Sequence, residues 1–334
     1  MSTLLSCGYL STVQAKADAI FADPMKNNDA IVDAIAAKAV LEQQAGVIRM
    51  PSIEGTKNKE LRVEWLTKCS PTTSACSDDC SIDGEDATPE CKDYELECLR
   101  ESKFKVSERV YRDRSIEKAE AVAFNMVRHM AAMDEYISSY VVTGLLANLG
   151  VNALGTFGPG TVAGTTTYIA PQYWDANLFG YWDHALRINK FRNTYGITGN
   201  NLYQLLWSAP LEDTKVNFKK VGTLKMYQDP ETIETVSPGT TFLIHKGAAA
   251  LITKAWNPLN AANAVNPAPG YWLWSEPSRN LPGMTYDIIM QQSCSDNDFH
   301  EAYKIQLHGL FAMNPYPCSE TNTGILLFEC GTGQ

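Results

Sequence analysis

The chain lacks the features that most quickly assign a protein to a functional class. No apolar run reaches about 18 residues, the length that spans a bilayer, and the start, Met1 to Tyr9, has neither the basic region nor the apolar core of a signal peptide. The catalytic signatures HExxH and GxSxG and the phosphate-binding glycine loops are also absent. We therefore expect a soluble, non-enzymatic protein that is made in a reducing cytosol, enters no membrane and needs no cofactor.

Positive charge is scarce. The 334 residues include 28 Lys and Arg against 38 Asp and Glu, giving a net charge of −10. Phosphate binding needs clustered Lys and Arg, so a broad nucleic-acid-binding face is excluded, although a local basic patch is not. With 45% hydrophobic and 20% charged residues, the chain is ordinary globular material for one large domain or two subdomains.

Histidines are few and scattered, and none has a local metal-ligand spacing: they are His129, His184, His245, His300 and His308. We therefore predict no metal site on them. His300 and His308 lie near Cys294 and Cys318 in the sequence, so a hydrolase with a cysteine nucleophile is kept as an alternative.

Cysteine, by contrast, is plentiful and unevenly placed. Of nine cysteines, five fall in one acidic stretch: Cys69, Cys76, Cys80, Cys91 and Cys98. Paired CxxC knuckles and the spacing of an EF-hand are both missing, which weakens a zinc or calcium interpretation without removing it. The alternatives are a solvated acidic loop with incidental thiols, or disulfides that form outside the cell.

This stretch sits in a predicted hairpin that precedes a long helix. Alternation from Leu61 to Trp65 resumes from Tyr94 to Val106 and predicts two strands joined by an acidic tip. A basic patch follows at the root, formed by Lys103, Lys105, Arg109, Arg112 and Arg114. One hypothesis is that the acidic tip of one subunit meets the basic root of the next, and the alternative is two solvated faces.

The long helix is the clearest predicted element. Starting from Ser115 as N-cap, apolar residues recur at helical spacing to about Gly144 or Gly150 with no proline. Such a helix would be about 45 Å long at 1.5 Å per residue. We expect its methionines, Met126, Met130 and Met133, to fill the core.

The remaining chain mixes helical and strand signals. A surface loop is predicted at 155–171, helices at 10–45, 174–192, 202–207 and 247–256, a helix start at 229–231, and strands at 242–244, 285–290, 303–307 and 324–330. The class is therefore α+β with mixed sheets. The aromatic run Tyr271-Trp272-Leu273-Trp274 suits a core or subunit interface, or alternatively a carbohydrate platform.

This order of elements resembles the major capsid proteins of tailed bacteriophages, the Hong Kong 97 type fold. The segments 242–248, 256–258 and 309–315 are also similar to capsid proteins of phages that infect Bacteroidetes-like hosts. The resemblance implies an N-terminal helical arm at 1–50, an extended hairpin loop at 51–114, a spine helix of the peripheral domain at 115–154, an axial domain at 155–285, and C-terminal strands at 286–334 shared between the two domains.

The same resemblance implies a function. It predicts a shell subunit that assembles into hexamers and pentamers of an icosahedral head, encloses double-stranded DNA without sequence-specific binding, and meets portal and scaffold or decoration proteins. Its location would be the virion capsid, after assembly in the host cytoplasm. The runner-up is a virion-associated or secreted carbohydrate-binding module that uses Tyr271, Trp272 and Trp274.

Overall fold

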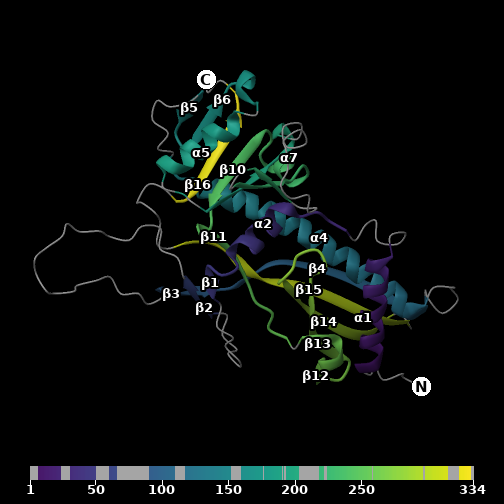
Figure 1. Cartoon of the computed structure of the whole chain (residues 1–334). Helices are drawn as coiled ribbons and strands as arrows, with labels where there is room; N and C mark the ends of the chain where they lie inside the picture. Colours follow the sequence, from purple (N-terminus) through teal and green to yellow (C-terminus); the bar gives the residue numbers. More distant parts are fainter. Residues whose placement is uncertain are drawn as a thin grey trace, which may run out of the picture.

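A computed structural model describes most of the chain. The described residues are 7–23, 31–49, 60–65, 90–109, 117–151, 159–175, 177–189, 191, 193–202, 218–221, 224–257, 259–295, 298–314 and 323–331. Within them the molecule is α+β and elongated along one long helix, with a different sheet toward each end (Figure 1).

The long helix, α4 (Lys118–Ala147), is the spine of the molecule. Its buried residues follow the 3.6-residue period, as in Val122, Met126, Met130 and Ile137. All three methionines predicted as core filler are buried. Ser115, the predicted N-cap, lies outside the described residues, and the helix begins after Glu117.

A six-stranded antiparallel sheet packs beneath α4. Its strands are β4 (Glu97–Ser107), β11 (Ala249–Thr253), β12 (Val265–Ala268), β13 (Tyr271–Pro277), β14 (Thr285–Ser295) and β15 (Asp298–Met313). The order is β11-β15-β14-β13-β12, and β4 pairs with β15 on the same edge as β11. The 16-residue strand β15 is therefore the central strand of this sheet, since it pairs with β4, β11 and β14.

A seven-stranded sheet lies at the other end. Its order is β5 (Gly160–Ala163), β6 (Thr166–Ile169), β16 (Ile325–Cys330), β10 (Thr240–His245), β7 (Thr194–Thr198), β9 (Leu224–Gln228) and β8 (Phe218–Val221). Helix α5 (Leu178–Ile188) covers one face through Leu178 and Trp182, which are fully buried. The short helices η1 (Pro171–Tyr173), η2 (Asn200–Leu202) and α7 (Thr232–Val236) join the strands.

Two N-terminal helices brace the body: α1 (Cys7–Ala22) packs on α4 and on the short helix η3 (Ala261–Asn263), and α2 (Ile35–Gln44) packs on α4 and β11. Buried Asp229 fixes α2, because its carboxylate accepts the backbone N–H of Ala36 at 2.8 Å. The same carboxylate accepts the N–H of Thr232 at 2.8 Å, so one side chain caps two helices.

The predicted hairpin is present, but its return strand is divided. Strand β2 (Glu60–Trp65) pairs with β3 (Glu90–Glu95) and with β1 (Ile48–Arg49) in a small separate sheet. The chain then turns at buried Leu96, and β4 joins the six-stranded sheet instead of continuing the hairpin. The predicted strand over 94–106 is thus two strands in two sheets.

The predicted helix at 247–256 is wrong, because this segment forms strand β11. Ala249 and Leu251 lie in the core under α4, whereas Ala250 and Ile252 lie in the cluster under the hairpin. A strand buried on both faces reads as a continuous apolar run, which periodicity alone does not separate from a helix. Gly247, with φ of +89°, forms the turn from β10.

A further difference concerns residues 155–171. The loop predicted there contains the hairpin β5–β6, turned by Gly164 at φ +62°. Farther along the chain, the change from the seven-stranded to the six-stranded sheet falls between β10 and β11. Strands β11 to β13 thus share the sheet of β14 and β15, while β16 returns to the seven-stranded sheet.

Candidate assembly surface

The root of the hairpin is fixed by an apolar cluster. Strand β2 turns Leu61, Val63 and Trp65 inward, where they pack with Ala250 and Ile252 of β11. The opposite row of the hairpin faces solvent, and there the Arg62 guanidinium donates to both carboxylate oxygens of Asp93 at 2.8 and 3.1 Å. The hairpin is consequently anchored at its base, on the edge that β11 and β15 present.

The predicted loop cysteines are placed only in part. Cys91 and Cys98 are exposed, on β3 and β4 respectively, and so stand in different sheets. Cys69, Cys76 and Cys80 lie outside the described residues. Cys98 is a free thiol whose sulfur accepts from the Gln306 side chain at 3.7 Å.

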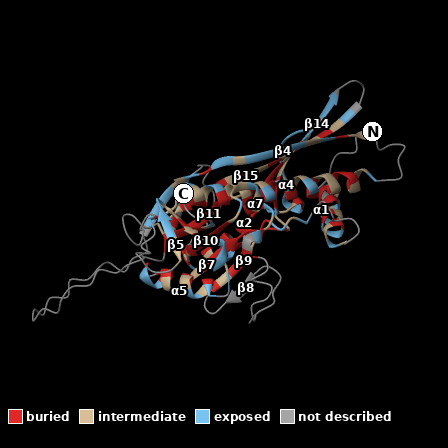
Figure 2. Cartoon of the chain, turned by 90° about the horizontal axis from the view of Figure 1, so that it is seen from above, coloured by how far each residue is buried: buried red, intermediate tan, exposed pale blue. Residues whose placement is uncertain are grey.

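The predicted basic patch begins on an open sheet face. Lys103 and Lys105 point away from α4, on the exposed side of β4, the strand that follows the outer edge of the molecule in Figure 2. Arg109 follows β4, and Arg112 and Arg114 lie outside the described residues. Sequence reasoning missed Lys304 of β15, which pairs in register with Lys103 across the ladder.

One acidic side chain, Glu101, reduces the positive charge of this patch. Glu101 accepts from Lys103 at 2.5 Å and from Lys304 at 3.0 Å. These two ammonium groups hold the pKa of Glu101 down, at about 2. The patch therefore carries one less positive charge than its lysines suggest. Lys105, which is exposed on the same face of β4, lies outside this triplet.

The other face of β4 is locked to the spine helix. Ser102 Oγ and His129 Nδ1 are 2.6 Å apart, and the His129 ring stacks on Phe104 with centroids 5.0 Å apart. The Arg100 guanidinium lies 4.3 Å from the ring centroid of Tyr136. Burial lowers the pKa of His129, which favours the neutral ring at pH 7. The ring fills the space between α4 and β4 and forms a hydrogen bond with Ser102.

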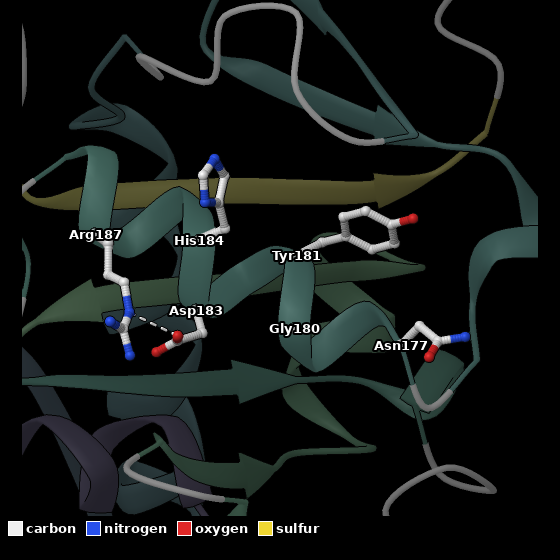
Figure 3. A pocket seen from close by; sticks show the side chains of 6 residues that line it. All are labelled: Asn177, Gly180, Tyr181, Asp183, His184 and Arg187. Carbon is white, nitrogen blue, oxygen red and sulfur yellow. Dashed lines mark hydrogen bonds and ion pairs between the residues drawn. The ribbon is translucent and has the colours of Figure 1, made fainter.

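A shallow depression lies on the outer surface of α5. It measures about 500 Å³ and is lined by Asn177, Gly180, Tyr181, Asp183, His184 and Arg187 (Figure 3). All six residues belong to α5 or its first turn, and Arg187 is already paired with Asp183 at 2.7 Å. Among the described residues, its lining comes from this one helix and its first turn.

The alternative chemistries find little support in the geometry. His308 lies 3.2 Å from Asp287, but this carboxylate already accepts from Ser275 and from backbone N–H groups of Trp256 and Asn257. Cys318 is outside the described residues, within which no group of three or more metal-ligating side chains occurs. No helix in the described part has the length and apolar character to cross a membrane.

The carbohydrate platform is not supported either. Trp274 is 1% exposed, and its indole N–H donates to Glu276 at 3.1 Å inside the core. Trp272, on the same face of β13, packs half-buried against the same core. These side chains fill the space between sheet and helices, as the core interpretation predicted.

Comparison with known proteins gives similarity only in solved structures. No family model and no curated protein matches the chain. It is similar to a structure titled "Capsid of native GTA particle computed with C5 symmetry", at 10% identity and TM-score 0.46 over 90% of this chain and 92% of that one. A phage PhiM1 mature capsid structure matches at 7% identity and TM-score 0.44, covering 83% of each chain. A Mycobacterium phage Che8 structure matches at 9% identity and TM-score 0.43, over 85% and 89%.

Proposed function

We propose that this protein is the major capsid protein of a tailed bacteriophage, with a fold of the Hong Kong 97 type. Its copies would assemble into the hexamers and pentamers of an icosahedral head around double-stranded DNA. The observation that carries the proposal is the hairpin β2–β3, which is rooted at the edge of a body braced by one 30-residue helix. A hairpin that projects from the body in this way is suited to contact a neighbouring subunit.

We propose the following division of the chain into domains. In this proposal residues 1–50 are the arm, 51–114 the extended loop, 115–154 the spine, 155–285 the axial region and 286–334 the shared strands. Closed rings of identical subunits repeat one contact many times, so that a modest interface becomes a stable shell. The patch of Lys103, Lys105 and Arg109, extended by Lys304, supplies a basic surface for the acidic tip of the next copy, with Arg112 and Arg114 expected beside it.

The net charge of −10 fits the same role. A shell that confines DNA works best without binding it tightly, and an acidic surface repels the phosphate backbone. Portal, scaffold and decoration proteins would be its further partners, the virion its location, and the host cytoplasm the place of assembly.

Size exclusion and negative-stain microscopy of the purified chain test the proposal. We expect rings or closed shells. A Lys105→Glu variant should assemble more slowly because it places a like charge against the acidic tip, whereas Arg187→Glu, a matched reversal on exposed α5, should assemble as the unchanged protein does.

Two outcomes would contradict the proposal. A monodisperse monomer at all concentrations that also binds a glycan array would favour the carbohydrate-binding alternative. Equal slowing by both charge reversals would show that net charge, and not the basic patch, controls assembly.

A further inference from the structure

Helix α1 is held on the body by side chains that reach two buried carboxylates. Its apolar residues Leu10, Val13, Ala17 and Ile20 face α4 and the six-stranded sheet. Beside this apolar contact, Tyr9 donates to Glu301 at 3.4 Å and Gln14 donates to Glu276 at 3.0 Å. Glu301 is 3% and Glu276 1% exposed, so both polar contacts are made in the interior.

The carboxylate of Glu301 has a cation of its own. Lys118 Nζ lies 2.7 Å from one oxygen, and the Tyr303 hydroxyl donates to the other at 2.9 Å. The direct ion pair and this hydrogen bond offset the cost of burying the carboxylate.

Glu276 is differently surrounded, because its two hydrogen-bond donors are neutral. Trp274 Nε1 donates to one oxygen and Gln14 Nε2 to the other. The positive charge of Arg279 lowers the pKa of Glu276, but Arg279 is itself 2.6 Å from Asp18 of α1, whose charge acts in the opposite direction. Two further titratable groups lie near Glu276. Tyr286 of β14, which is neutral, pairs with Glu276 in register, and Asp134 of α4 accepts a hydrogen bond from the Tyr286 hydroxyl.

We propose that α1 is a proton-sensitive latch, which docks more firmly on β13 when the Glu276 carboxyl is protonated and more weakly when it is ionised. The geometry supplies the asymmetry: Glu301 forms a direct ion pair with Lys118, whereas the two groups that donate hydrogen bonds to Glu276 are neutral. The attachment at Glu276 is therefore the one that we expect to vary with pH.

The sign of the effect follows from linkage. Burial is the main cause that raises the pKa of Glu276, from 4.5 to about 7. Release of α1 exposes the carboxyl to water and returns its pKa toward 4.5, so the docked state binds the proton more tightly. The extra docking stability is fully present below about pH 4.5, decreases as the pH rises toward 7, and is lost above that. The docking equilibrium changes by up to about 300-fold over this range.

Hydrogen–deuterium exchange on the full chain measures the latch directly. Protection of the α1 amides, corrected for the intrinsic exchange rate at each pH, should fall up to a few hundredfold between pH 5 and pH 8. The α4 amides serve as the internal reference, since one face of the spine helix is buried along its length. Constant α1 protection across this range would overturn the proposal.

Variants separate the two attachments. Glu276→Gln, which cannot ionise, should give α1 protection that no longer depends on pH. Tyr9→Phe, its matched control at the Glu301 contact, should lower protection by the same factor at both pH values. If Glu276→Gln retains the pH dependence of the unchanged chain, another group is the sensor and the proposal is wrong.

A reciprocal variant covers the case in which Glu276→Gln fails to fold. Gln14→Glu places a second carboxyl against Glu276 from half-buried α1, so that two like charges must approach when both ionise. Protection of α1 should then decrease more steeply with pH than in the unchanged chain. An unaltered pH profile would equally overturn the latch.

Discussion

Single buried carboxylates join distant parts of this chain. Asp134 of α4 is fully buried and accepts from Ser278 at 2.9 Å, from Asn280 at 3.0 Å and from Tyr286 at 2.5 Å. All three donors come from the segment that connects β13 to β14 or from the start of β14. This one side chain therefore fixes the β13–β14 connection against the spine helix.

Replacing Asp134 should be costly. Asp134→Ala leaves three donors without this acceptor, two of them on the buried residues Asn280 and Tyr286, and we expect the free energy of unfolding to fall by about 3–5 kcal/mol. Asp183→Ala on α5 removes an exposed carboxylate from an ion pair and should change it by less than about 0.5 kcal/mol. Urea titration followed by circular dichroism measures both, and equal effects would contradict the role assigned to Asp134.

The sequence does not reveal these residue pairings. Asp134 and Asn280 are 146 positions apart, and an acidic residue within an apolar helical period looks like a solvated interruption. The sequence also did not reveal that Lys304 belongs to the basic patch, because only the register between β4 and β15 brings it opposite Lys103. What the sequence does predict at this scale is the burial of the three methionines of α4, since their spacing alone sets their face.

At the scale of elements, β11 illustrates how a strand depends on close backbone approach. It pairs with the end of β15, and a Cβ placed on Gly309 would lie 2.5 Å from the carbonyl oxygen of Ile252. Only glycine permits this ladder at its natural spacing. The side-chain amide of Gln44 supplies further backbone partners to β11, donating to the Leu251 carbonyl at 3.1 Å and accepting the Leu251 N–H at 2.7 Å.

Gly309→Ala should therefore destabilise the fold, by about 1–3 kcal/mol, because the new methyl group pushes β11 from β15. Gly180→Ala is the matched control: a Cβ there meets nothing within 4 Å, and the residue is helical. That variant should be neutral or gain up to about 1 kcal/mol. Chemical denaturation of both proteins checks the pair, and a neutral Gly309→Ala would show that the ladder accommodates the methyl group.

Elements with a single buried face show their period in the sequence. The spine helix and the strands around Leu61, Tyr286 and Ile305 show their period because their other face meets solvent or a half-buried layer. The segment 249–253 was misread as helix because both of its faces are covered. The division of the return strand at Leu96 could not be predicted either, since the alternation of apolar and polar residues continues where the chain passes from one sheet to the other.

At the scale of the whole molecule, the cysteines pose a question about cross-linking. Cys91 and Cys98 occupy different strands at the root of the hairpin, and both are exposed. We propose that thiols of the group Cys69, Cys76, Cys80, Cys91 and Cys98 form disulfides within the loop or between subunits after release from the cell. An odd number of thiols leaves one to pair elsewhere.

Purified particles compared on non-reducing and reducing gels test this. Disulfides between subunits would give oligomeric bands, and disulfides within the loop would give a single chain of altered mobility; both should revert to one reduced band. Cys330→Ser, which removes an exposed thiol from the seven-stranded sheet, should leave the non-reduced pattern unchanged. Identical mobility under both conditions would show that the loop thiols remain reduced.

The long strand β15 also decides how the molecule responds to force. Its ladder with β4 runs antiparallel through ten register pairs, from His300–Ser107 to Gly309–Glu97, and its C-terminal end pairs with β11. Ladder hydrogen bonds lie across the strands, so a pull along β15 loads them together in shear, whereas a pull across it opens them one after another. Tension directed along the spine thus meets the strong direction of the sheet, and a load that peels the hairpin sideways meets the weak one.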